Sequence, residues 1–378
     1  MSLYKIILGI ALSATIGANA QEPAIPVPKK TIRNFINPDS LQLMNLKIVP
    51  IPIFTSTPET GIRVGAALEY FFNAKDKESE ARGSYIHGQF TYSTLGQVEV
   101  KSTWQVFTKG EKFVYRGSGG FSTYNDRFWG VGNNTVDEKN FLPQDYSRIF
   151  LESKTYRLLK NQWYVGMKLD YNDVYNVVNK KPLTPDQLDV PGINGSKTLG
   201  IGPAILYEGR DFPFSAHSGA YAEFYFTRNI AFKNNPFNYN TWFLDLRKYF
   251  PLSQNSTLAF QLHSMHATGN VPVRELPRVG GSVLMRGYFT GRFRDHSFTA
   301  LQAEYRFLIW RWIYGAAFGS AGVIDESIAS YSTSNLLKAG GLGLRFLLNK
   351  KNRMFVRFDY ALNSTAGGAY YIRLSEAF

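Results

Sequence analysis

The 378-residue chain contains no cysteine, which excludes disulfide scaffolds, thiolate zinc sites, cysteine nucleophiles and lipid attachment to an N-terminal cysteine. Charged residues are also scarce, at 19% of the chain against about 25% in soluble globular domains. Apart from the extreme N-terminus there is no long apolar run, so the sequence does not predict membrane-spanning helices. Aromatic residues, in contrast, make up 15% of the chain, and such a composition collapses rather than staying disordered.

The N-terminus predicts export. Lys5 ends a short basic segment, residues 6–16 are apolar, and Ala18-Asn19-Ala20 is a small-x-small cleavage site. Because the apolar segment is too short to span a bilayer, we expect a signal peptide at residues 1–20 that is cleaved after Ala20. The alternative is an uncleaved hydrophobic tail. The formal net charge of +13 would suit nucleic acid, acidic lipid headgroups or acidic polymers, but export removes nucleic acid as an expected partner.

Beyond the signal peptide, the composition predicts one domain preceded by a linker. Residues 21–45 are polar and rich in proline, and they are too few for a core of their own, so we expect a periplasmic linker. No break in composition follows, and residues 46–378 are predicted to form a single domain.

Polar and apolar residues alternate along many segments of that domain. In residues 299–307, for example, Gln302, Glu304 and Arg306 alternate with Leu301 and Tyr305. Such alternation predicts strands with one wet face and one apolar face, which a soluble sandwich would also show. The segments run about 10–13 residues, as tilted membrane strands require, whereas strands in globular proteins cluster near 5–6 residues.

About sixteen such segments can be marked, an even number that is typical of bacterial outer-membrane barrels. They are residues 47–55, 61–73, 83–94, 96–107, 111–123, 146–158, 162–172, 197–208, 219–229, 238–250, 256–266, 297–309, 312–324, 335–347, 353–362 and 368–377. Connections after even-numbered strands are mostly tight, and the long ones (124–145, 173–196 and 267–296) follow odd-numbered strands. This asymmetry predicts an all-β fold, a 16-stranded antiparallel transmembrane β-barrel with periplasmic turns and external loops.

Catalytic motifs are missing from the sequence. His263 and His266 are three apart and therefore lie on opposite faces of a strand, where they cannot share a metal. No H-E-x-x-H, G-x-S-x-G or phosphate-loop pattern occurs. We therefore expect no enzyme, catalytic residue, metal or cofactor. The alternative is an outer-membrane lipase or protease whose catalytic residues are dispersed along the chain.

The longest loop and its flanks carry the most specific pattern. The segment from Val279 to Tyr288 ends in Arg286-Gly287-Tyr288, and Ala303-Glu304-Tyr305-Arg306-Phe307 follows in the next strand. With the preceding Asp211-Phe212-Pro213, this resembles the BamA/TamA-type superfamily of bacterial surface antigen barrels, which includes the two-partner secretion transporters. The resemblance covers roughly Pro50 to Phe378. It implies a 16-stranded barrel whose sixth extracellular loop folds into the lumen and carries an Arg-Gly-aromatic tip.

The physical roles of that tip can be stated for this chain. A guanidinium inside a lumen requires an acceptor, and Glu304 faces the lumen by parity, so Arg286 and Glu304 are predicted to form a clamp. Gly287 would allow a tight turn, and Tyr288 would pack while its hydroxyl finds a partner. The family's Phe-x-Asp-x-Gly pattern in the thirteenth strand has Ser320 at the position of the acid, so we expect a clamp with one charge fewer. The alternative is a solvated loop arginine.

Prolines in the first strand suggest a weak junction. Pro50 and Pro52 lie two apart, so both remove hydrogen-bond donors toward the same neighbour. Strand two is held by a tight hairpin, so the depleted edge is expected to face the last strand, with Ile51 opposite the region of Ile372. The hypothesis is a seam that opens laterally. Alternatively, the prolines belong to the linker.

The end of the chain resembles the C-terminal β-signal of outer-membrane barrels. Tyr370, Ile372, Leu374 and Phe378 share one parity, and the last residue is aromatic. Glu376 departs from the pattern, because it falls on the parity that should be apolar.

The resemblance implies a role in outer-membrane protein insertion and assembly or in protein translocation. Residues 21–45 are too few for a POTRA module of about 75–80 residues, so we expect a barrel without such modules that works with a separate periplasmic or outer-membrane protein. Outer-membrane lipid and lipopolysaccharide are the other expected partners. The alternative is a non-translocating structural barrel or a small-solute pore.

Overall fold

The structure is a computed structural model that describes residues 48–72, 84–133, 135, 139–212, 215–232, 235–349, 353–365 and 367–378. The expected signal peptide at residues 1–20, its cleavage site and the linker at residues 21–45 lie outside these residues. Within them, no helix is both long enough and apolar enough to cross a membrane.

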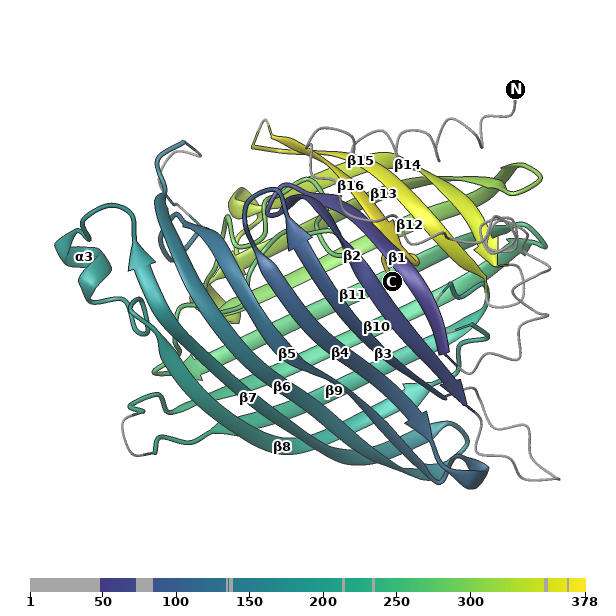
Figure 1. Ribbon diagram of the computed structural model, residues 1–378, viewed down its shortest axis with the longest axis horizontal. Helices are drawn as coiled ribbons and strands as arrows, with labels where there is room; N and C mark the ends of the chain where they lie inside the picture. Colours follow the sequence, from purple (N-terminus) through teal and green to yellow (C-terminus); the bar gives the residue numbers. More distant parts are fainter. Residues whose placement is uncertain are drawn as a thin grey trace, which may run out of the picture. The chain divides into compact units, whose positions relative to one another are not determined.

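The described residues form sixteen strands that close into one barrel, in which each strand pairs with the next along the chain and β1 pairs with β16 (Figure 1). All neighbours for which a register is given are antiparallel. The strands are β1 (Ile48–Thr57), β2 (Gly61–Phe72), β3 (Ser84–Ser93), β4 (Val98–Phe107), β5 (Phe113–Phe128), β6 (Leu142–Lys160), β7 (Trp163–Asn179), β8 (Ser196–Glu208), β9 (Gly219–Asn229), β10 (Tyr239–Ser253), β11 (Ser256–Gly269), β12 (Ser297–Trp310), β13 (Ile313–Asp325), β14 (Leu337–Asn349), β15 (Met354–Asn363) and β16 (Gly368–Leu374). The predicted number of strands and the closed antiparallel barrel are confirmed.

The β5–β6 hairpin and the following strand β7 are longer than predicted. β5 and β6 remain paired out to Phe128 opposite Leu142, and the rings of Tyr124 and Tyr146 stack across the two strands at 5.0 Å. Because cross-strand aromatic pairs stabilise a ladder, the predicted loop 124–145 shortens to residues 129–141. The loop after β7 likewise shortens to residues 180–195. It contains the single-turn helix α3 (Pro185–Leu188), which Figure 1 shows at the far end of β7.

The two faces of the barrel wall differ as the alternation predicts. On β12, Leu301 is 55% and Tyr305 40% exposed, whereas Gln302, Glu304 and Arg306 are buried. Exposed large apolar side chains recur on β2, β8, β14 and β15 in the same alternating manner. In a closed barrel successive side chains point outward and inward, so the exposed apolar side chains form the outer face and the buried polar ones the inner face.

Tight turns join most even-numbered strands to the next strand. Between β6 and β7, Lys160 pairs with Trp163 across a two-residue turn, and both Asn161 and Gln162 have positive φ. Two positive φ values define a type I′ turn, whose twist matches that of the strands. The long connections lie after β5, β7 and β11, at the opposite rim.

Two of the apolar cores are formed where loops pack on strands. One core joins the loops at the long-loop rim and contains Phe128, Leu142, Ile193, Val271 and Leu276. A second core gathers Val279, Met285 and Tyr288 of residues 270–296 with Phe298 of β12 and Ile324 of β13. The longest loop is therefore packed along much of its length.

The last strand is shorter than predicted, because β16 ends at Leu374 and Ser375 has a φ of +67°. This turn carries Phe378 away from the outer face. Phe378 is buried in a core with Ala216, Tyr249 and Ala259, and its carbonyl oxygen accepts a 2.9 Å hydrogen bond from Arg306 Nη2. The prediction that Phe378 shares one strand face with Tyr370, Ile372 and Leu374 is therefore wrong.

Candidate functional site

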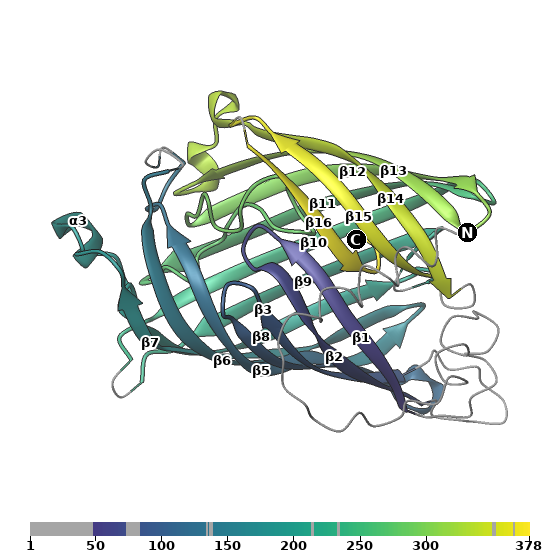
Figure 2. The same ribbon diagram turned by 45° about the horizontal axis from the view of Figure 1, so that its top comes forward.

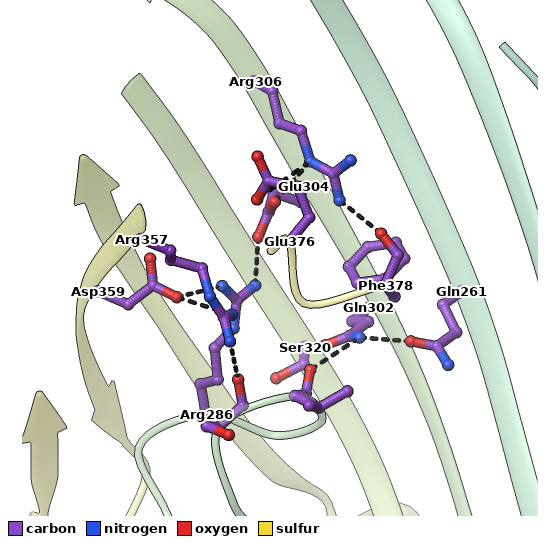
Figure 3. Close-up of polar contacts among 12 residues, drawn as sticks. Gln261, Arg286, Gln302, Glu304, Arg306, Ser320, Arg357, Asp359, Glu376 and Phe378 are labelled. Carbon is purple, nitrogen blue, oxygen red and sulfur yellow. Dashed lines mark hydrogen bonds and ion pairs between the residues drawn. The ribbon is translucent and has the colours of Figure 1, made fainter. Parts of the chain in front are cut away.

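The candidate site is centred on Arg286, near the middle of residues 270–296. Its Nη2 donates to Glu304 Oε2 on β12 at 2.5 Å, and its Nη1 donates to Asp359 Oδ2 on β15 at 2.7 Å. The guanidinium carbon lies 3.4 Å from the centre of the Phe318 ring on β13, in a cation–π contact. Arg286 and Glu304 are both buried. The structure thus brings together the two residues that were predicted to form a clamp (Figure 3).

Asp359 is the acid that sequence reasoning missed. Besides Arg286, it accepts hydrogen bonds from Arg345 Nη1 at 2.5 Å and Arg357 Nη1 at 3.1 Å. The signal was present in the sequence, because Arg357 and Asp359 alternate with apolar residues of one strand and so share the inner face.

Ser320 does not take part in these contacts. Its hydroxyl donates to the carbonyl oxygen of Ala339 at 3.4 Å. The prediction that serine at this position leaves the clamp one acid short is wrong, because β15 supplies the second carboxylate in place of β13.

These contacts belong to a larger charge cluster. Arg345 Nε also donates to Glu376 Oε2 at 2.9 Å, and Arg306 Nε donates to Glu304 Oε1 at 2.7 Å. The charge cluster is defined as Arg286, Arg306, Arg345, Arg357, Glu304, Asp359 and Glu376. Removing one member of such a buried set leaves the charges of its partners uncompensated, which is strongly destabilising.

Gly287 places the loop backbone directly against the wall. It has a φ of +113°, its N–H donates to Tyr371 Oη at 3.0 Å, and its carbonyl oxygen accepts from Asn363 Nδ2 at 2.7 Å. A Cβ atom at this position would lie 3.0 Å from the carbonyl oxygen of Leu362. Both the backbone conformation and the close approach therefore require glycine.

Tyr288 is buried beside Phe293, with the two rings in an edge-on arrangement. Its hydroxyl group lies 3.1 Å from the carbonyl oxygen of Lys338 and 2.8 Å from Ser364 Oγ. The ring thus packs in a core while its polar end is satisfied, as expected for a buried tyrosine.

The same loop also reaches the β1–β2 turn. Both the backbone N–H and the hydroxyl of Thr290 donate to Glu59 Oε1, at 2.7 and 2.8 Å. The carbonyl oxygen of Glu59 accepts from Gln97 Nε2 at 2.9 Å, which ties the turn to the wall. Residues 287–290 are therefore bonded to β15 and β16 on one side and to the β1–β2 turn on the other.

We call the junction of β1 and β16 the seam (Figure 2). β1 pairs with β2 along its full length of ten residues, but its register with β16 consists of one pair, Ser56 opposite Ile372. The prediction that Ile51 lies opposite the region of Ile372 is wrong, because Ser56, five residues further along β1, takes that position. No local turn links the first and last strands, and their register is set by the closed barrel as a whole.

The backbone of Pro50 and Pro52 points toward the β16 side. On β2, the carbonyl of Ile62 accepts from Thr94 N and its N–H donates to Thr94 Oγ1, so even-numbered residues of β2 face β3. Pro50 lies opposite Leu68, and Pro52 lies opposite Ala66. Opposite residues in an antiparallel pair bond to each other or both face away, so the prolines face away from β2. The register of the seam, continued along β1, would place Pro52 opposite residue 376, beyond the end of β16.

Two neighbouring loop residues, Arg274 and Glu275, have pKa values shifted by burial. Arg274 donates to the carbonyl oxygen of Gly192 at 2.8 Å and to Gln144 Oε1 at 3.0 Å, and burial lowers the pKa of its guanidinium. Burial raises the pKa of the Glu275 carboxyl, which accepts a hydrogen bond from Asn172 Nδ2. Glu275 borders a polar cavity of about 320 Å³ that is lined by residues of β4 to β7 and of β9 to β11.

The described residues contain no group of three or more His, Asp or Glu side chains arranged to hold a metal ion. His263 and His266 lie on opposite faces of β11, because His263 pairs with Ala300 and His266 with Ser297 of β12.

No family model and no curated protein sequence matches the chain. Solved structures do. BamA from Haemophilus ducreyi lacking POTRA domains 1–3 superposes with a TM-score of 0.55 at 11% identity, covering 87% of this chain and 70% of that one. CdiB from Escherichia coli gives 0.58 at 9% identity, covering 88% and 63%. CdiB from Acinetobacter baumannii gives 0.56 at 10% identity, covering 87% and 60%.

The chain therefore has the fold of the BamA and CdiB barrels, which confirms the fold implied by the sequence resemblance. The matches span 60–70% of the length of those chains.

Proposed function

We propose that this chain is an outer-membrane β-barrel of the BamA/TamA type that inserts or translocates proteins by opening the seam. The observation that carries the proposal is the single registered pair between β1 and β16, next to two prolines that remove donors from the same edge. A closed barrel keeps all its backbone groups paired in hydrocarbon, so a poorly paired junction is where the wall separates at the least cost. Such a role requires no covalent step.

We further infer that residues 270–296 lie in the lumen as the sixth extracellular loop. Arg286 supports this inference, because its partners Glu304 and Asp359 belong to the inner face of the wall. In the same arrangement, the bonds of Thr290 to Glu59 and of Gly287 to Tyr371 tie the loop to both edges of the seam. The loop would thereby hold the seam closed at the rim of the long loops.

Partners follow from this placement. The exposed apolar side chains of the outer face would contact outer-membrane lipid and lipopolysaccharide. Clients would be supplied by a separate periplasmic or outer-membrane protein, and no nucleic acid is involved.

The second candidate is a small-solute pore or a structural barrel that does not translocate. The polar cavity of about 320 Å³ favours the pore, because it leaves part of the lumen unfilled. Planar-bilayer recordings distinguish the two candidates: a stable open conductance of the purified barrel would favour the pore over a gated seam.

The seam is tested by a reversible cross-link. Residues directly opposite in an antiparallel ladder have Cα atoms about 5.5 Å apart, within the range that a disulfide spans. Ser56→Cys with Ile372→Cys in this cysteine-free chain should lock the seam under oxidising conditions. The expected result is loss of function in the host bacterium, read as depletion of outer-membrane or exported proteins, and recovery on reduction.

The matched control joins β16 to its other neighbour. Tyr360 and Tyr370 lie directly opposite on β15 and β16 and are both exposed, so the pair Tyr360→Cys with Tyr370→Cys adds a disulfide without crossing the seam. This variant should keep its function. Full function of the locked seam would refute the proposal.

A further inference from the structure

Three arginines stand side by side on the inner face next to the seam. Arg345 on β14 lies directly opposite Arg357 on β15, and Arg357 lies directly opposite Arg373 on β16. Like charges directly opposite each other destabilise a sheet unless anions lie among them.

The row continues on the other side of the seam. Since Ser56 lies opposite Ile372, Thr55 is the β1 residue level with Arg373. Thr55 in turn lies directly opposite Arg63 on β2. Odd-numbered residues on these strands face inward, as shown by the buried Thr55, Arg63 and Arg357. Arg345, Arg357, Arg373, Thr55 and Arg63 thus form one row, which we call the seam row.

Carboxylates bond directly to arginines at the ends of the seam row, whereas Glu59 and Glu99 act on Arg373 at its centre only over a longer distance. Arg345 and Arg357 bond to Asp359, and Arg63 Nη1 lies 3.1 Å from Glu99 Oε1. The side chain of Arg373 has no hydrogen bond or ion pair with any other residue that the structure describes. On its two sides, the Nε atoms of Arg357 and Arg63 are buried and also have no acceptor.

We propose that the seam row binds the phosphate group of a membrane lipid at Arg373. Neighbouring strands are about 4.8 Å apart, so guanidinium groups on adjacent strands can share the oxygens of one phosphate. A lipid supplies the phosphate because the outer face at the seam is apolar, with Phe54 and Tyr370 exposed there. Its acyl chains lie against these residues, and its headgroup reaches the inner face where β16 ends at Leu374.

This inference rests on the proposed placement of the barrel in a membrane. Its test uses purified barrel without client or cells, so its outcome is independent of the cross-linking experiment. The barrel in detergent is titrated with phosphatidylglycerol, diacylglycerol and inorganic phosphate, and bound species are counted by native mass spectrometry. Phosphatidylglycerol should bind, and diacylglycerol, which has the same chains and no phosphate, should not.

Arg373→Gln should weaken phosphatidylglycerol binding about tenfold or more, the usual effect of losing hydrogen bonds to a charged group. Arg373→Lys should retain part of the binding. Arg228→Gln is the matched control, since Arg228 is an exposed arginine of β9 that donates to Asn240 Oδ1, and it should bind like the unmodified chain.

Three results would overturn the proposal: unchanged lipid binding in Arg373→Gln, equal binding of diacylglycerol, or inorganic phosphate that binds as tightly as the lipid. Folding of each variant is verified by its circular dichroism. Should Arg373→Gln fail to fold, Thr55→Val removes one donor of the row without removing a charge, and it should weaken lipid binding about threefold. An unchanged affinity in this variant would likewise count against the seam row.

Discussion

Replacement of Asp359 by asparagine tests the charge cluster most directly. The asparagine side chain would keep the shape of the aspartate but lose the charge that three arginines share, namely Arg286, Arg345 and Arg357. Breaking a buried ion pair by neutralising one partner costs about 3–5 kcal/mol. Because the contact to Arg286 holds the loop to β15, we expect much of this cost to weaken the docking of the loop. At about 1.4 kcal/mol per factor of ten, the undocked population should rise at least about a hundredfold.

The assay uses a single introduced cysteine, since the chain has none. Met285 is fully buried beside Arg286, so Met285→Cys reacts with a maleimide only when the loop undocks. When undocking is fast relative to labelling, the rate follows the undocked population. Asp359→Asn should therefore accelerate labelling about a hundredfold or more.

The control is Asp173→Asn, which breaks the pair of Asp173 with the half-exposed Lys197, 2.9 Å apart on β7 and β8. Exposed pairs contribute about 0–1 kcal/mol, so labelling should hardly change. Equal labelling rates in Asp359→Asn and the unmodified chain would refute the reasoning, because the arginines would then not depend on Asp359.

Further predictions use the same labelling assay or protease sensitivity. Glu304→Ala should cripple the protein in vivo or expose the loop to protease, because three arginines lose a carboxylate; unchanged function and protease resistance would contradict the clamp. Gly287→Ala should loosen the tip, since a side chain at φ +113° meets the backbone of β15; labelling at the normal rate would show that the wall can yield. The docked loop raises the pKa of the Glu275 carboxyl. Docking is therefore most stable below the carboxyl's pKa in the unfolded chain, and this stability is lost as pH rises through its pKa in the folded protein. Glu275→Gln should therefore slow labelling of the loop at neutral pH and have little effect at low pH. An effect that does not change with pH would show that ionisation of Glu275 does not weaken docking.

Sequence patterns predicted the wall of the barrel well, because the alternation of faces and the turns are local properties. The side-chain period of two predicts that Glu304 faces inward, and together with the family resemblance it predicts the contact of Arg286 with Glu304. Asp359 was missed even though it has the correct parity. Which of several inward acids a loop arginine reaches depends on how that loop crosses the barrel, and no local rule specifies this.

The errors lie where distant segments meet. Ile51 was expected opposite the region of Ile372, but no turn joins the two ends of the chain, and the shear of the whole barrel sets the register of the first and last strands. The shared parity predicts Phe378 on the same face as Tyr370, but β16 ends at Leu374, followed by a positive φ at Ser375. No sequence pattern predicts a positive φ at this serine. The packing of Phe378 against Tyr249 and its hydrogen bond from Arg306 stabilise the conformation.

The prolines of β1 also affect how readily a strand of another molecule could pair with this edge. An unpaired strand edge normally templates the addition of strands from other molecules, and natural proteins block such edges with proline. Ile48, Pro50 and Pro52 turn three carbonyl groups but only one N–H toward the side that β16 leaves uncovered. A strand from a second barrel would find acceptors without donors there and would leave its own carbonyls unsatisfied. In the proposed membrane setting, the part of β1 that the structure describes would therefore resist strand addition by a second copy.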